Sequence, residues 1–369
     1  MASPSPYMAR ALAAARQVRG FTSPNPWVGA VVVRDGGILS VGATSPPGGP
    51  HAEAAALAGT PDARGADVYV TLEPCAPFPG KRTPPCAQAL VDAGVRRVVV
   101  ALEDPDPGVR GRGIALLRES GVVVEVGDGD AQALALLRPY VKHRQSGLPY
   151  VILKFAASLD GRVATASGDS KWVTGESARD RAHQERAWVD AVLVGSGTVL
   201  ADDPMLTARP GGRPATRQPA RVVLDSRGRV SATATFLHQP GHAIVATAPA
   251  APDGWKRAIA ATGAQVIECE SDGRGINLHQ LLATLGRRGV MSAWVEGGPA
   301  LLGSMLDEQL ADELWAFIAP VVIGGDGLPA VGGRGATTVS EAFRLVDPHL
   351  EELPPDILVR GYTGMWDPR

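Results

Sequence analysis

Apolar residues in the first third of the chain form short runs that alternate with segments of helical spacing. The β-branched run at 28–33 predicts a buried strand, and Gly36-Gly37 turns the chain back into a second strand at 38–41. Helical spacing is present at 7–12 and at 51–58. Further strands are expected at 68–72, 95–102 and 122–126, and further helices at 86–93 and 114–119. This alternation predicts an α/β domain with consecutive crossover connections.

A polar segment at 142–149 separates this domain from a second one. A chain of 369 residues exceeds the usual size of a single hydrophobic core, so two domains are expected. We predict a first domain at 1–145 and a second at 146–369. The pattern predicts that the second is also α/β, without giving its strand order. Its strands are expected at 150–156, 189–194, 220–224, 243–246, 292–295, 315–322 and 357–361, and its helices at 177–188 and 299–309.

Composition and charge restrict the classes of partner. The chain is 45% hydrophobic and 20% charged with a net charge of −2, which argues against a broad basic or membrane-binding face. We therefore expect a small-molecule substrate, and neither nucleic acid nor a membrane as a partner. Three cysteines in so long a chain indicate a reducing compartment, and we expect a cytoplasmic protein. Segment 1–34 lacks acidic residues, as transit peptides do, but its helical spacing favours the first helix of the domain.

The candidate chemistry of the first domain lies in His51, Cys75 and Cys86. One imidazole and two thiolates are three of the four ligands of a tetrahedral zinc site. His51 and Cys86 stand at expected helix starts and Cys75 follows an expected strand, so all three should converge at turns of one sheet. The positive ends of the helix dipoles there favour ionised thiolates. Because a fourth position left for water is typical of catalytic zinc, the sequence predicts a catalytic zinc ion.

Glu53 follows the histidine by two residues and is the expected proton carrier. Zinc lowers the pKa of its bound water toward about 7. Glu53 would take the proton of that water, leaving hydroxide to attack an amine-bearing carbon, and would pass the proton to the departing ammonia. This combination predicts hydrolytic removal of an amine from a nucleobase-like ring. Asn25, held between two prolines, is either a substrate contact or a plain turn residue.

Three features stand out in the second domain. An apolar strand runs into the motif EGGP at 296–299 and then a helix, an arrangement that leaves backbone N–H groups free for a phosphate. Another strand ends in GSGT at 195–198, which lacks the third glycine of the Rossmann fingerprint, so a Rossmann domain is not expected. Arginines are dense in 177–210, where one or two of them could clamp a sugar phosphate: Arg179, Arg181, Arg186 and Arg209.

Four motifs of the first domain resemble those of the bifunctional riboflavin-biosynthesis deaminase/reductase family. They are TSPNPWVG at 22–29, GPHAE at 49–53, TLEPC at 71–75 and RTPPC at 82–86. The resemblance implies a cytidine-deaminase-like three-layer fold with the zinc site described above. It also implies hydrolysis of the ring amine of 2,5-diamino-6-(5-phosphoribosylamino)pyrimidin-4-one, with Glu53 as catalytic residue and Asn25 in contact with the substrate.

The segment between the two cysteines departs from the family pattern. Ten residues separate Cys75 from Cys86, and they begin with APFPGK at 76–81, where family members usually have a shorter, polar loop. Lys81 and Arg82 are candidates to meet a phosphate. The departure leaves one alternative, a pathway paralogue with an active reductase and an altered or inactive deaminase half. A second, disfavoured alternative is a non-catalytic, zinc-stabilised scaffold that binds nucleotides.

The second domain resembles the reductase half of the same family. The motifs are KFAASLDGR at 154–162, GDSKWVT at 168–174, TVLADDPMLT at 198–207, EGGP at 296–299 and LVRGY at 358–362. With the first domain, the resemblance covers about residues 7–362. It implies a dihydrofolate-reductase-like fold that uses NADPH to reduce the ribosyl group of the deaminated product to a ribityl group. Because members of the family commonly assemble, we expect a homo-oligomer.

The resemblance also implies the site residues of this half. Lys154 would contact the ribose and polarise the ring-opened sugar for hydride delivery. The substrate would be held by Ser170, Arg186, Leu206, Arg209 and Glu296. NADPH would be held by Ala156, Trp172, Thr198, Asp202, Gly298, Pro299, Ala300, Leu301, Leu302, Gly303 and Ser304, with Ser226 as a weaker candidate.

Overall fold

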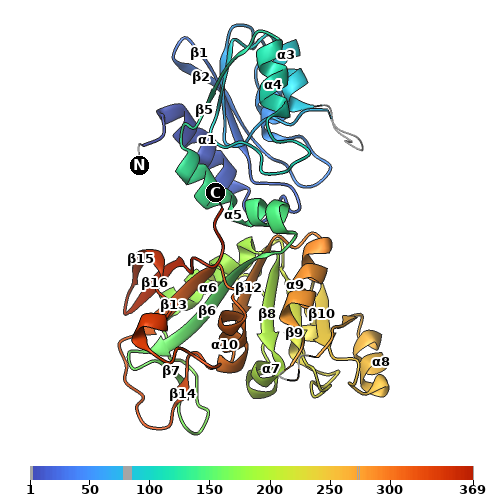
Figure 1. Ribbon diagram of the computed structural model, residues 1–369, viewed down its shortest axis with the longest axis vertical. Helices are drawn as coiled ribbons and strands as arrows, with labels where there is room; N and C mark the ends of the chain where they lie inside the picture. Colours follow the sequence, from blue (N-terminus) through green and yellow to red (C-terminus); the bar gives the residue numbers. More distant parts are fainter. Residues whose placement is uncertain (1–2, 78–84, 272, 274, 369) are drawn as a thin grey trace. The chain divides into compact units, whose positions relative to one another are not determined.

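A computed structural model describes residues 3–77, 85–271, 273 and 275–368. The chain divides into two compact units, one ending at Gly147 and the other running from Leu148 to Asp367 (Figure 1). The polar segment at 142–149 was expected to be a break between the two domains. Helix α5 (Asp130–Ser146) instead continues through most of it. Gly147 ends this helix with φ 72°, a left-handed conformation that glycine adopts easily. The polar residues at 142–146 therefore form the last turn of this helix.

The first unit is built on a five-stranded sheet. Its strand order is β2-β1-β3-β4-β5. Strand β1 pairs antiparallel with both β2 and β3, whereas β3, β4 and β5 run parallel to one another. The parallel connections are the crossovers expected from the alternating pattern. The strands are β1 (Gly29–Arg34), β2 (Gly37–Ala43), β3 (Asp67–Val70), β4 (Arg97–Val100) and β5 (Val123–Val126).

Helices cover both faces of this sheet and make it the middle of three layers (Figure 1). On one face Leu12 of α1 (Pro6–Gln17) and Ala133 of α5 share a buried cluster with Val31 and Val99 of the sheet. The other face carries three helices, and His51 and Cys86 stand at the starts of the first two. The three helices are α2 (Ala52–Ala58), α3 (Cys86–Asp92) and α4 (Arg112–Glu119).

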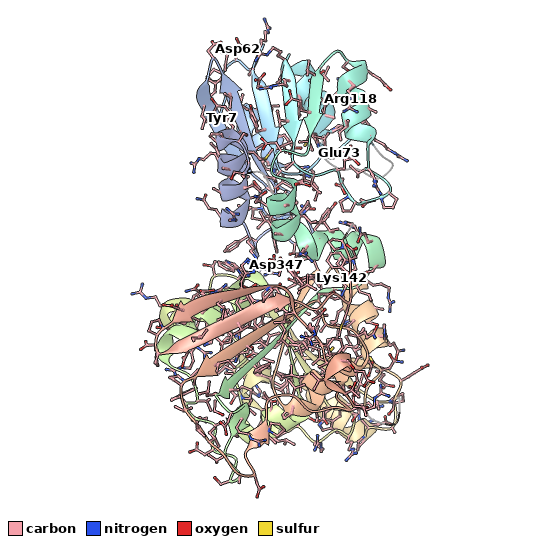
Figure 2. All side chains as sticks on the ribbon, turned by 60° about the vertical axis from the view of Figure 1, so that its left-hand side comes forward. Tyr7, Asp62, Glu73, Arg118, Lys142 and Asp347 are labelled. Carbon is pink, nitrogen blue, oxygen red and sulfur yellow. The ribbon has the colours of Figure 1, made fainter. Side chains whose placement is uncertain are left out.

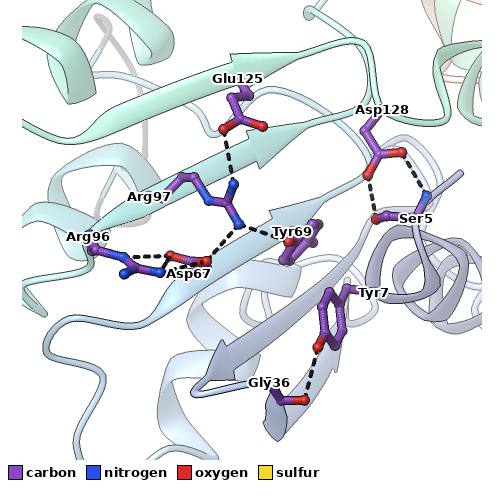
Figure 3. Close-up of polar contacts among 9 residues, drawn as sticks. All are labelled: Ser5, Tyr7, Gly36, Asp67, Tyr69, Arg96, Arg97, Glu125 and Asp128. Carbon is purple, nitrogen blue, oxygen red and sulfur yellow. Dashed lines mark hydrogen bonds and ion pairs between the residues drawn. The ribbon is translucent and has the colours of Figure 1, made fainter.

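A polar cross-tie of side chains links the amino ends of β3 and β4 to β5 (Figure 3). Asp67 at the start of β3 accepts hydrogen bonds from Arg96 at 2.9 Å and from Arg97 at 2.7 Å. Arg97 also donates to Glu125 of β5 at 3.0 Å and to the Tyr69 hydroxyl at 3.1 Å. The side chain of Asp67 is only 9% exposed, so this carboxylate is shielded from water, whereas Arg96 and Glu125 are largely exposed. The cross-tie fixes the strand ends opposite those from which the site loops emerge.

The second unit contains a nine-stranded sheet. Its order is β11-β10-β9-β8-β12-β6-β13-β16-β15, and all neighbours pair in parallel except β16, which runs antiparallel to both β13 and β15. A separate two-stranded ribbon is formed by β7 (Arg162–Ala164) and β14 (Leu328–Pro329). The sheet strands are β6 (Tyr150–Ser158), β8 (Ala191–Gly195), β9 (Ala220–Leu224), β10 (Ala243–Thr247), β11 (Gln265–Glu268), β12 (Ser292–Glu296), β13 (Glu313–Ala319), β15 (Val346–Leu353) and β16 (Asp356–Tyr362).

Alternate residues of the central strands point into two separate cores, one on each face of the sheet. Ile152 lies in one cluster, whereas Val151 and Leu153 lie in the other. Such strands read as continuous apolar runs because both of their faces are covered. The covering helices are α6 (Glu176–Trp188), α7 (Ser196–Asp202), α8 (Asp253–Ala261), α9 (Leu278–Arg287) and α10 (Pro299–Asp307), with short 3-10 turns at Pro210–Gly212, Thr235–His238 and Val339–Glu341.

Candidate functional site

The three predicted metal ligands of the first unit lie together. His51 is the residue before α2, Cys75 follows β3, and Cys86 is the first residue of α3. His51 Nδ1 is 3.5 Å from Cys75 Sγ and 3.4 Å from Cys86 Sγ. All three donor atoms lie within 4.8 Å of one another, a spacing that suits ligands of one ion. An imidazole and two thiolates are donors that zinc prefers, so these residues fit the metal.

Glu73, labelled in Figure 2, holds the turn that carries Cys75. Its buried carboxylate accepts four backbone N–H groups, from Asp104, Gly111, Gly113 and Ile114, at 2.9–3.2 Å. Gly113 is packed so closely that a Cβ atom there would lie 1.8 Å from the carbonyl oxygen of Pro74. The chain immediately before Cys75 is therefore fixed from two sides.

Glu53 lies in the first turn of α2 and is buried beside the metal ligands. Burial raises the pKa of Glu53 to about 7, and the neighbouring Cys75 acts in the same direction. A cation bound by His51, Cys75 and Cys86 acts in the opposite direction, because it favours the charged carboxylate. Glu53 is thus a carboxyl group whose proton affinity depends on the adjacent metal site.

A cavity of about 360 Å³ opens beside this group and is lined by Asn25, His51, Glu53 and Cys75. Asn25 therefore faces the same space as His51, Cys75 and Glu53. Part of the segment at 76–81, including Lys81, and also Arg82, lie outside the described residues.

The wall of this cavity contains four side chains that the sequence did not reveal as site residues: Asp104, Asp106, Tyr140 and Arg144. Burial raises the pKa of Asp104 to about 6. The Arg144 guanidinium lies 5.1 Å from the centre of the Tyr140 ring, and its Nε is 3.7 Å from Asp106 Oδ2. Tyr140 and Arg144 belong to α5, and the sequence pattern gave no helix at their position. No signal therefore linked them to the zinc motifs.

The second unit contains a larger cavity, of about 1360 Å³. It opens at the carboxyl ends of β6, β8 and β12, which are neighbours in the sheet. Lys154 lies on β6, Gly195 ends β8, and Glu296 ends β12. The crevice at the carboxyl ends of parallel strands is the usual place for a ligand in an open α/β sheet.

A buried charge network lies in this cavity. Glu296 accepts a hydrogen bond from Arg186 Nε, and Glu296 Oε2 is 3.8 Å from Lys154 Nζ. Burial alone would raise the pKa of Glu296, but Arg186 and Lys154 outweigh it and hold that pKa at about 2. Burial lowers the pKa of Lys154, and Glu296 opposes this effect. The network keeps Glu296 ionised and fixes both cations at the cavity wall.

The Gly-Gly turn after β12 depends on glycine for its geometry. Gly297 has φ 126°, and a Cβ atom there would lie 2.7 Å from Thr198 Oγ1. The same hydroxyl oxygen accepts the N–H of Gly298 at 3.0 Å. This contact joins the start of α10 to α7, so the two glycine-containing turns noted in the sequence meet at one end of the cavity.

Most residues predicted to hold substrate or NADPH line the larger cavity. The predicted substrate residues that line it are Ser170, Arg186, Leu206, Arg209 and Glu296. The predicted cofactor residues that line it are Ala156, Trp172, Thr198, Asp202, Gly298, Pro299, Ala300 and Leu301. The lining does not include Ser226, Leu302, Gly303 or Ser304. Leu302 is buried in a core cluster, and Gly303 packs against Gly332, because both lie on the inner side of α10.

Two family descriptions match the chain. Residues 1–102 match the cytidine and deoxycytidylate deaminase zinc-binding region, and residues 149–359 match the RibD C-terminal domain. The matches define a zinc-dependent deaminase domain joined to a reductase domain, and they confirm the predicted fold class. The first is cytidine-deaminase-like, and the second has the reductase fold predicted from the resemblance.

Relatives that match over nearly the whole chain identify its family. The chain is 42% identical to the riboflavin biosynthesis protein RibD of Bacillus amyloliquefaciens, over 95% of this chain and 94% of the relative. It is 40% identical to RibD of Escherichia coli, over 92% of each chain. The solved structure of Acinetobacter baumannii RibD superposes with a TM-score of 0.87 at 37% identity, covering 96% of this chain and 97% of that one. The chain belongs to the RibD family of bifunctional riboflavin biosynthesis enzymes.

A second solved structure supports the same conclusion. The Thermotoga maritima diaminohydroxyphosphoribosylaminopyrimidine deaminase/5-amino-6-(5-phosphoribosylamino)uracil reductase superposes with a TM-score of 0.84 at 33% identity, covering 97% of each chain. The protein is therefore a bifunctional deaminase and reductase of riboflavin biosynthesis, with zinc and NADPH as its cofactors. No comparison favours the alternatives of an inactive deaminase half or a non-catalytic scaffold. None of the helices in the described parts of the chain is long and apolar enough to cross a membrane.

Proposed function

We propose that the chain performs two successive reactions on one phosphorylated pyrimidine. The first is hydrolytic deamination of 2,5-diamino-6-(5-phosphoribosylamino)pyrimidin-4-one, and the second is NADPH-dependent reduction of the ribosyl group to ribityl. The observation that carries the proposal is a buried carboxylate, Glu53, that lines the same cavity as His51 and Cys75, two of the three converging zinc donors. The Thermotoga maritima relative, whose name contains both activities, supports these substrates.

In the deaminase half, Glu53 is the proposed proton carrier. Zinc, when held by His51, Cys75 and Cys86, would lower the pKa of the attacking water. The Glu53 carboxylate accepts a proton from this water and then donates it to the leaving amine nitrogen. Asn25 lines the same cavity and is proposed to orient the pyrimidine by hydrogen bonds from its amide.

In the reductase half, Lys154 is the proposed polarising group. NADPH supplies the hydride when bound. Lys154 donates a hydrogen bond to the ring-opened sugar and so makes the carbon that accepts the hydride more electrophilic. Glu296 keeps this ammonium positioned through their 3.8 Å ion pair. Arg186 and Arg209 are proposed to hold the sugar phosphate, and Ser170 and Leu206 are proposed as further substrate contacts, because all four line the same cavity.

The proposed cofactor contacts are the predicted residues that line the reductase cavity. A hydride can be delivered only if NADPH and substrate share one enclosed space, so residues outside its lining are weaker candidates. We propose the set Ala156, Trp172, Thr198, Asp202, Gly298, Pro299, Ala300 and Leu301.

We also propose that residues 1–145 carry the deaminase activity and residues 146–369 the reductase activity. The division of the chain after Gly147 supports this boundary. Two substitutions test both assignments in the whole protein. Glu53→Gln should lower the rate of ammonia release by about 10²–10⁴-fold and keep one zinc per chain. The same variant should still oxidise NADPH when given the deaminated product.

Lys154→Gln is the matched variant for the other half. It should release ammonia at the normal rate but reduce the deaminated product at least about 10²-fold more slowly, with unchanged NADPH affinity. Ammonia release by Glu53→Gln at the wild-type rate would exclude Glu53 as the proton carrier. Normal NADPH oxidation by Lys154→Gln would exclude Lys154 in the same way.

A homo-oligomer and a cytoplasmic location are further parts of the proposal. Apolar side chains remain exposed along the last part of the reductase unit, including Val339, Phe343 and Leu350, and Leu350 lies on the edge strand β15. A second copy of the chain would cover them. Light scattering should give more than one chain per particle, and Leu350→Glu should lower that number. The two thiolate ligands need a reducing compartment, which supports the cytoplasm.

A further inference from the structure

We propose that His183 is a third member of the phosphate-binding group of the reductase cavity, beside Arg186 and Arg209. We further propose that it takes up a proton when the substrate's phosphate binds. The proposal rests on the reductase function stated above. It adds a residue that neither the sequence motifs nor the family resemblance indicated.

The position of His183 follows from the geometry of helix α6. Asp180, His183 and Arg186 are spaced by three residues and therefore lie on one face of the helix. All three line the reductase cavity, and so does Arg209 from the chain segment after α7. His183 is thus one helical turn from the proposed phosphate ligand Arg186.

A backbone contact sets the tautomer of the neutral imidazole ring of His183. The N–H of Arg209 donates to His183 Nδ1 at 3.3 Å. A neutral imidazole that accepts at Nδ1 carries its hydrogen on Nε2. His183 therefore offers an Nε2–H donor as well as a link to the backbone of the neighbouring arginine.

The charges around this histidine are unbalanced in favour of cations. Glu296 is shared between Arg186 and Lys154. Across the described residues, Arg209 has no carboxylate within ion-pair distance, and its Nη1 donates to the Thr207 hydroxyl and lies 3.4 Å from Met205 Sδ. Burial and Arg186 lower the pKa of Arg209. A phosphate dianion would balance this excess and accept bonds from both guanidinium groups.

The protonation state of His183 depends on the same charges. Burial, then Arg186 and Arg209, lower the pKa of His183 to about 4, while Glu296 and Asp180 oppose them more weakly. Asp180 is itself occupied, because it accepts from the Gly211 N–H and from Gln184. His183 is therefore neutral near pH 7 in the empty cavity. A phosphate dianion between the two arginines would reverse the local field and raise the pKa of His183, so that binding recruits a proton. This proton enters at Nδ1, so the 3.3 Å contact from the Arg209 N–H to that atom breaks when the phosphate binds.

Two substitutions at His183 distinguish its role as a hydrogen-bond donor from its role in proton uptake. His183→Ala removes both, and it should raise the KM for the phosphorylated substrate by about tenfold while kcat changes less than about twofold. The KM for the substrate lacking its phosphate should not change. His183→Gln keeps an N–H donor without titration, so it should raise KM less than His183→Ala at pH 8. His279→Gln, at an exposed position of α9, is the matched control and should behave as wild type.

The number of protons taken up should not depend on His183 if this residue has only a structural role. Calorimetric titration with the phosphorylated substrate at pH 6.5, in buffers of different ionisation enthalpy, counts the protons bound per chain. Wild type should take up about half a proton more than His183→Gln. Equal proton counts in the two proteins would overturn the proposal. Equal loss of affinity by His183→Ala for the phosphorylated and unphosphorylated substrates would overturn it too. NADPH oxidation by the wild type tests the underlying reductase function separately.

Discussion

Tyr140 donates its hydroxyl hydrogen to the carboxylate of Asp104, with oxygen–oxygen distances of 3.1 and 3.2 Å. Asp104 Oδ1 also accepts the N–H of Asp106 at 2.9 Å. Arg144, the nearby cation, is 3.7 Å from Asp106 and has no such contact with Asp104. Within the described parts of the chain, the buried Asp104 carboxyl group has hydrogen-bond donors but no counter-charge within ion-pair distance.

This arrangement predicts that Asp104 lowers the stability of the protein at neutral pH. Its pKa is raised by burial from 3.8 to about 6, so its favourable contribution is present below about pH 4 and is lost as the pH rises through 6. Asp104→Asn should therefore increase the free energy of unfolding at pH 8 by up to about 3 kcal/mol. Urea denaturation at pH 5 and pH 8 should show a larger gain at pH 8. The control Asp92→Asn, at an exposed position, should show neither effect, and equal gains at both pH values would contradict the explanation.

Gly113→Ala should disturb the metal site from a distance. The added Cβ would meet the carbonyl oxygen of Pro74, the residue before Cys75, at 1.8 Å, and backbone cannot move aside cheaply. We expect a loss of about 2–4 kcal/mol and less than one zinc per purified chain. Gly37→Ala is a suitable control, because the nearest atom to its Cβ would lie at 3.5 Å. Full zinc content in Gly113→Ala would show that the close approach does not position Cys75.

Removal of zinc should separate the two activities. A chelator should abolish ammonia release, while NADPH oxidation with the deaminated product continues. A lower unfolding temperature is also expected, because a metal that binds only the folded chain stabilises it by mass action. Calorimetry with and without chelator measures this, and Glu53→Gln should show the same shift, because its ligands are intact. Loss of NADPH oxidation on chelation would mean that the reductase half also needs the metal.

Glu296→Gln should be far more costly than neutralising a surface carboxylate. It would leave the partly buried Arg186 and Lys154 without their shared counter-charge, at a cost of about 3–5 kcal/mol. The KM for the phosphorylated substrate should rise with it. Glu268→Gln removes a 2.9 Å ion pair with Lys256, but the carboxylate there is 50% exposed, so less than about 1 kcal/mol is expected. Similar losses in chemical denaturation would contradict the role of burial.

Local sequence patterns predicted the central elements of both units. The strand expected at 220–224 is β9 as observed, and the helices expected at 177–188 and 299–309 correspond to α6 and α10. The strand expected at 315–322 ends at Ala319 instead. Strand β15 was missed, and its mostly exposed residues, with charged and apolar types mixed, explain why. The buried central strands leave a clear pattern, and the exposed edge strand β15 does not.

Residues placed by contacts between distant segments could not be found from the sequence. His51, Cys75 and Cys86 are recognisable because zinc requires particular side chains at turns. Tyr140 reaches the deaminase cavity from a helix whose polar last turn resembled a linker. His183 has the right helical spacing, but its meaning depends on the backbone N–H of Arg209, 26 residues away along the chain.

The two ends of the segment between the cysteines are clamped to each other. Cys86 N–H points to Cys75 Sγ at 3.4 Å, and Ala87 N–H donates to the Cys75 carbonyl oxygen at 3.1 Å. Contacts between the described ends of this segment, together with Glu73, therefore hold the two cysteines. Because the entropy of closing a loop grows only slowly with its length, insertions here are inexpensive. This position is a natural place to graft foreign loops, and so to redirect the deaminase toward other aminated rings without rebuilding its zinc centre.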